Sequence, residues 1–188
     1  MNKKIYPIRW FNTTHHWGVI MITLHWVSAL MIVGMLALGL WMVELSYYHN
    51  WYHKGPNLHK SIGITLFILT FIRLFWRKFN RCPLPLGIHN SQEKKLATAM
   101  HKLLYVLLIF IMVSGYLIST ADGRAISVFN YVQVPALIHG IEQQEDVAGV
   151  VHLWLAISLV SMAALHMMAS MKHHFFDHDR TLKRMFGF

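Results

Sequence analysis

The stretch Val147–Met171 reads VAGVVHLWLAISLVSMAALHMMASM, and it decides the fold. Its 25 residues include no Lys, Arg, Asp or Glu, and a helix needs only about 20 apolar residues to cross a bilayer. Two histidines, His152 and His166, interrupt the apolar run. Ionisable side chains are costly inside a bilayer and usually mark function there. We therefore expect a membrane-spanning helix that carries chemistry.

The spacing of these two histidines tells where they face. They lie 14 positions apart, which corresponds to about 21 Å along a helix axis and only about 40° around it. Both side chains therefore point to the same side of the helix, and one lies near each face of the membrane. Residues between the two levels, such as Trp154, are expected to be packing and not an electron relay.

The whole chain has the composition of an integral membrane protein, since 55% of its 188 residues are hydrophobic and 13% are charged. Residues 1–188 are expected to form a single all-α membrane domain, a four-helix bundle with a cofactor in its core. The first apolar run is too long for a signal peptide and no cleavage site follows it. The four helices are predicted at about 17–42, 59–76, 101–120 and 147–171.

Three polar or mixed segments complete the prediction. Residues 86–100 are expected to be a polar connector, and the Pro-Leu-Pro at 83–85 ends the second helix before it. A short surface helix is expected within 121–146. The tail 172–188 is basic and amphipathic.

The distribution of charge predicts the orientation. Residues 1–16, 73–102 and 172–188 hold 14 of the 17 Lys and Arg residues, and cytoplasmic segments carry such an excess. Both termini are therefore expected in the cytoplasm, with four passes through the membrane. Most of the formal charge of +9 then reports topology and contact with anionic lipid, so no nucleic-acid partner is needed to explain it.

Four histidines fall at two matched depths in these spans. His25 and His166 lie near the cytoplasmic side, whereas His59 and His152 lie near the outer side. A bundle that offers two facing histidine pairs matches the needs of two non-covalent b-type haems, each held by one axial imidazole from each of two helices. The pairs are predicted as His25–His166 and His59–His152. With both axial positions filled, the remaining chemistry is electron transfer.

These histidines also fit roles that do not involve haem. A single membrane histidine is more often a hydrogen-bonding residue between helices than a ligand. A di-metal site or a proton relay would call for Asp or Glu within the spans, and the predicted spans contain neither.

Several neighbouring residues have a weaker signal. His101 is expected to support the cytoplasmic pair and not to bind iron. Arg73 fits two roles equally well, a partner for a haem propionate or a side chain that reaches the headgroups. Gly63 and Gly115 allow close approach of either a haem or a neighbouring helix.

Four pieces of sequence together resemble the bacterial cytochrome b561 family. They are the TLHW around His25, the LHKSIG around His59, the 14-residue spacing in the last helix, and the tail HHFFDHDRTLKRM at 173–185. The resemblance implies a four-helix bundle in the inner membrane of a bacterium, with two haems b and the same four histidine ligands. One member of that family is a superoxide oxidase that reduces ubiquinone, which implies an oxidoreductase here.

Two functions remain open at this point. The chain either exchanges electrons between quinone and a small outer-side species such as superoxide, or conducts them for a separate periplasmic redox protein. An anionic substrate favours a basic funnel. On the predicted outer side, three basic residues face five acidic ones, and the basic residues are Lys54, Lys60 and Arg124.

Overall fold

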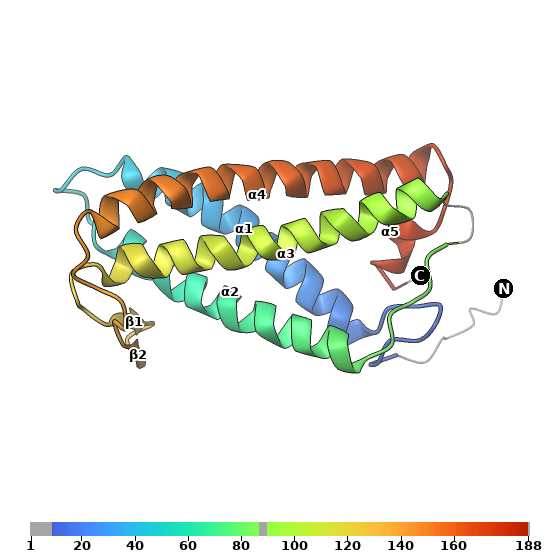
Figure 1. Cartoon of the computed structure of the whole chain (residues 1–188), viewed down its shortest axis with the longest axis horizontal. Helices are drawn as coiled ribbons and strands as arrows, with labels where there is room; N and C mark the ends of the chain where they lie inside the picture. The colour runs from blue at the N-terminus through green and yellow to red at the C-terminus, as the bar shows by residue number, and fades with distance from the viewer. Residues whose placement is uncertain (1–8, 87–89, 188) are drawn as a thin grey trace.

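The computed structural model describes residues 9–86 and 90–187 as four long antiparallel helices with a small hairpin at one end (Figure 1). The prediction of an all-α membrane bundle is confirmed, because all four helices are long and apolar enough to cross a bilayer. They are α1 (Val19–Val43), α2 (Lys54–Phe79), α3 (Ser91–Thr120) and α4 (Gln144–Phe175), and a single turn, α5 (Thr181–Arg184), follows.

Helices α2, α3 and α4 are longer than predicted. The largest error is in α3, which was expected to begin at His101 and begins at Ser91. Asn90 caps it, since the Asn90 side chain accepts from the Glu93 backbone N–H at 2.8 Å and the Glu93 carboxylate accepts from the Asn90 N–H at 3.1 Å. This reciprocal capping box satisfies two exposed donors, so a helix starts within a segment too polar to look like a span.

The segment after α3 also differs from the prediction. A two-stranded antiparallel hairpin, β1 (Ile126–Val128) and β2 (Val132–Val134), replaces the expected surface helix. The hairpin packs onto α2, where the Ser61 hydroxyl accepts from the Phe129 N–H at 3.0 Å. β-Branched residues in short runs favour strands over helices, which explains the outcome.

The bundle consists of two helix pairs. Helix α3 packs closely along α4, and α1 packs along α2, whereas the contacts between the two pairs are sparser. At mid-height an apolar cluster of Leu66, Leu108 and Leu159 joins α2, α3 and α4. Apolar side chains therefore fill the middle of the seam between the two pairs.

The outer surface of the helices is strongly apolar. Leu30 of α1, Phe75 of α2 and Trp154 of α4 are 72%, 66% and 64% exposed. Large apolar side chains are normally buried in a soluble protein, so this surface suits lipid. Trp154 therefore lies on the outer surface of α4 and does not fill the space between the two histidine levels.

One end of the bundle gathers the start of α1, the end of α2, the start of α3 and the end of α4 (Figure 1). The Trp26 indole N–H donates to the Met185 carbonyl at 2.8 Å, which ties α1 to the C-terminal segment. This is the end predicted to face the cytoplasm. Lys3 and Lys4, which contribute to that prediction, lie outside the described residues.

Candidate functional site

The predicted outer histidines meet across the seam. His59 of α2 and His152 of α4 have ring centroids 6.3 Å apart and planes inclined at 69°. Imidazole nitrogens bind a transition-metal ion such as zinc at about 2.0–2.1 Å, so this separation leaves room for one metal ion between the rings. Each helix pair contributes one histidine.

Glycines make room for both rings. A Cβ on Gly115 of α3 would lie 3.0 Å from Cε1 of His152, and a Cβ on Gly39 of α1 would lie 3.3 Å from Cε1 of His59. Both distances are tight for carbon atoms. Gly39 was missed in the sequence, because nothing in the sequence of α1 shows which residue of α2 it faces. Gly63 has a different role, since its Cβ would meet only Met35 at 3.6 Å.

Hydrogen bonds fix the orientation of the His152 ring. Its Nδ1 lies 3.0 Å from the Ile111 carbonyl oxygen and 3.0 Å from the Ser114 hydroxyl. A carbonyl oxygen only accepts, so Nδ1 must carry the proton in that bond. The Nε2 lone pair is then free, which is the form in which histidine binds a metal. Nδ1 of His59, by contrast, is buried without a hydrogen-bond partner.

The inner level holds a larger cluster than predicted. His25 lies within electrostatic range of His166, His101 and Arg73, so the structure gathers the predicted inner pair into one region. The ring in contact with His166 belongs to His101, however, at a centroid separation of 5.0 Å. Nδ1 of His25 accepts from Nη2 of Arg73 at 2.8 Å.

Three buried donors near this cluster have no partner. They are Nε of Arg73, the Trp76 indole N–H and the Tyr105 hydroxyl, and the Arg73 guanidinium lies 5.4 Å from the centre of the Tyr105 ring. Buried polar groups are nearly always hydrogen-bonded, so each exception calls for an explanation. A carboxylate of a bound cofactor fits this donor set, because arginine binds carboxylates well.

One of the three basic residues of the predicted outer funnel is paired with a carboxylate. Nε of Arg124 donates to the Asp122 carboxylate at 2.6 Å, and this pairing lowers the pKa of Asp122. The positive charge of Arg124 is therefore largely offset locally. Lys54 and Lys60 lie in the first two turns of α2, and Lys54 was expected in the loop before this helix.

Comparisons with known proteins agree with this architecture. A family model described as prokaryotic cytochrome b561 matches residues 16–188. Cytochrome b561 homolog 2 of Escherichia coli K12 is 51% identical over 176 residues, which cover 94% of both chains. Cytochrome b561 homolog 1 of the same organism is 25% identical over 171 residues, which cover 87% of this chain and 93% of that protein.

Proposed function

Because the chain belongs to the prokaryotic cytochrome b561 family, which binds haem b and transfers electrons in bacterial membranes, we propose that it carries electrons across the inner membrane through two haems b. The observation that carries this proposal is the placement of histidines at two levels of one seam, separated by the apolar cluster at mid-height.

We assign His59 and His152 as the residues that would hold the outer haem, and His25 and His166 as the residues that would hold the inner one. The outer assignment is supported by the 6.3 Å between the two rings and by the free Nε2 of His152. The inner assignment is supported by the electrostatic proximity of His25 and His166. It requires the Arg73 guanidinium to leave Nδ1 of His25, and the unpartnered donors beside it would then bind the carboxylates of the cofactor.

Bound haem b supplies a one-electron couple whose potential depends on its ligands and on burial. The protein contributes position and exclusion of water. The Ile111 carbonyl holds the His152 ring in its metal-binding tautomer, and Leu66, Leu108 and Leu159 keep the seam dry between the two levels. No side chain between the levels needs to change its redox state.

The ligand assignment predicts separate losses at the two levels. His152→Ala should remove the outer haem and His166→Ala the inner one, because each change removes one of the two histidine nitrogens that would bind the iron. We would measure haem per protein by pyridine haemochrome assay and the two midpoints by redox-titrated visible spectra. His53→Ala, in the exposed loop before α2, is the control and should retain two haems. One haem per chain in the unmodified protein would overturn the assignment.

The electron partners proposed here are the quinone pool and a small species at the outer side, with superoxide as the candidate that the family resemblance suggests. Stopped-flow mixing of the reduced protein with ubiquinone, and of the oxidised protein with superoxide, tests both halves. If superoxide is the substrate, Lys54→Gln with Lys60→Gln should slow its oxidation and flatten the dependence on salt. Arg124→Gln should have a smaller effect, because Asp122 already offsets that charge.

A separate periplasmic redox protein is the second candidate partner. It is favoured by the aromatic surface at the outer end, where Tyr48 and Tyr131 are 93% and 91% exposed, since protein interfaces are enriched in tyrosine. Equal superoxide rates for the parent and for the Lys54→Gln/Lys60→Gln variant at low ionic strength, with both haems retained, would favour this candidate.

A further inference from the structure

Three segments that lie far apart in the sequence line a half-open hollow at the predicted cytoplasmic end of the bundle. It has a volume of about 730 Å³, and it lies between the segment before α1, the segment after α2 and the segment around α5. Arg9, His15 and His16 line it on one side and Arg180 and Arg184 on the other, and Leu84 contributes to its apolar wall.

Hydrogen bonds hold the three segments in place. The Leu84 N–H donates to the Thr14 carbonyl at 2.9 Å, and Nη1 of Arg184 donates to the Leu84 carbonyl at 3.0 Å. The Arg9 carbonyl in turn accepts from the Val19 N–H, at 2.8 Å, where α1 begins. The arginine side chains therefore extend from two backbone segments that these hydrogen bonds hold together with the third.

The hollow carries an excess of positive charge. Among the described residues, no carboxylate lines it. The nearby Asp179 is buried and accepts from the N–H and the hydroxyl of Thr181 at 2.7 and 2.8 Å. Burial lowers the pKa of His16, and the charges of Arg9, Arg180 and Arg184 lower it further. Nε of Arg184 is buried with no hydrogen-bond partner.

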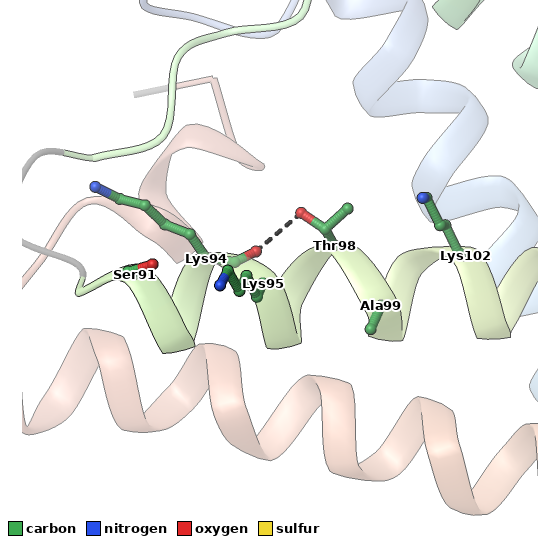
Figure 2. Close-up of a pocket in the computed structure, with 6 residues that line it drawn as sticks. All are labelled: Ser91, Lys94, Lys95, Thr98, Ala99 and Lys102. Carbon is green, nitrogen blue, oxygen red and sulfur yellow. Dashed lines mark hydrogen bonds between the residues drawn. The ribbon is translucent and has the colours of Figure 1, made fainter.

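A lysine cluster on α3 provides the contrast. Lys94, Lys95 and Lys102 also lie toward the predicted cytoplasmic end, but all three project from a single helix over an open surface (Figure 2). Thr98 beside them donates to the Lys94 carbonyl of its own helix at 2.8 Å. Such lysines attract anionic lipid in general, whereas the arginine hollow has fixed walls from three segments.

We propose that the hollow binds the phosphate group of an anionic phospholipid from the cytoplasmic leaflet. The planar guanidinium group donates paired hydrogen bonds to phosphate oxygens, and the hollow offers three of them. A lipid is favoured over a soluble phosphate because the apolar wall at Leu84–Leu86 would contact acyl chains, as would the exposed Phe11, which lies between Arg9 and Thr13 in the sequence. The proposal does not depend on the proposed electron-transfer role.

Native mass spectrometry of the full-length haem-loaded protein tests this proposal. The detergent-purified protein is mixed with phosphatidylglycerol or with phosphatidylcholine of the same acyl chains, and retained lipid is counted. We expect a clear preference for phosphatidylglycerol. Arg9→Gln with Arg180→Gln should weaken it by at least about tenfold, because two charge-assisted contacts are lost. Both side chains are exposed, and the Arg184–Leu84 bond stays intact.

The matched control is Lys94→Gln with Lys95→Gln, which removes the same charge from the same end and should keep the preference. An equal loss in the control would overturn the proposal, as would no preference in the parent. Inorganic phosphate is added in a parallel arm. Displacement of lipid by millimolar phosphate, or binding of phosphate without a lipid preference, would show a soluble-anion site and overturn the lipid assignment. Unchanged visible spectra and melting temperatures verify that each variant is folded, and Arg180→Gln alone serves if the double variant is not.

Discussion

At the scale of single residues, the ring of each outer histidine packs against a glycine of a neighbouring helix. Gly115 and Gly39 stand against the rings of His152 and His59, and the Ile111 carbonyl selects the tautomer of His152. Supporting groups of this kind orient metal ligands and raise their basicity. The chemistry of the outer level therefore extends beyond the two histidines.

This arrangement predicts the effect of one methyl group. Gly115→Ala should displace the His152 ring, because the new Cβ would lie 3.0 Å from Cε1, and should reduce or spectrally shift the outer haem. The measurement is haem content together with the low-temperature α-band spectrum.

Gly149→Ala is the matched control, since it lies in the same helix as His152 and its Cβ would meet nothing within 4 Å. Alanine is better than glycine in a helix by about 1 kcal/mol, so the control should be at least as stable as the parent. Two haems with an unchanged spectrum in Gly115→Ala would contradict this prediction, because the His152 ring would then have room for the methyl group.

At the scale of elements, the start of α3 is set by polar chemistry. The Asn90–Glu93 capping box begins the helix, and Lys172 of α4 lies 3.5 Å from the Glu93 carboxylate. The first turns of α3 therefore extend alongside the end of α4, beyond the apolar stretch that the sequence marks. The hairpin at the other end similarly depends on Ser61 of α2.

Loss of the cap should destabilise the protein measurably. Asn90→Ala should cost about 1 kcal/mol, because the Glu93 N–H loses its acceptor, which corresponds to roughly 2–4 °C in melting temperature for a chain of this size. Thermal unfolding in detergent, followed by circular dichroism, measures the shift. Gln92→Ala, at an exposed position of the same turn, should leave the melting temperature unchanged. Equal shifts in the two variants would mean that the cap contributes nothing beyond helix propensity.

At the scale of the whole molecule, the pairing of the helices places the histidines, and the distribution of basic residues predicts the orientation. Two tightly packed pairs, α1–α2 and α3–α4, leave a seam that holds the histidines, and the basic residues gather toward one end of that seam. Under the positive-inside rule we expect this end to face the cytoplasm. The proposed lipid site would then lie at the cytoplasmic leaflet, and the aromatic outer loop would lie in the periplasm.

The orientation predicts the behaviour of C-terminal fusions. Alkaline phosphatase fused after Phe188 should be inactive, because it folds only in the periplasm, whereas a fluorescent protein at the same position should be bright. Fusions within the hairpin loop at residues 129–131 should give the reverse result. An active phosphatase at the C-terminus would invert the topology and place the arginine hollow on the outer side.

The sequence alone was enough to predict the four membrane-length helices and the all-α membrane class. The choice of His25, His59, His152 and His166 as haem ligands stays a prediction. Apolar length and the 3.6-residue period are local properties, and a span needs nothing more than these to be recognised. The family resemblance, carried by TLHW, LHKSIG and the C-terminal tail, was also confirmed by the comparisons.

Only the tertiary structure decided which groups meet. Gly39 faces His59, His101 rather than His25 contacts His166, and the charge of Arg124 is offset by Asp122. The arginine hollow joins residues from opposite ends of the chain. Helix rotation, register and loop paths set these contacts, and they follow from the packing of all the helices at once. The type of a residue limits the groups that it can contact, and the packing of the helices decides which of those groups lie within its reach.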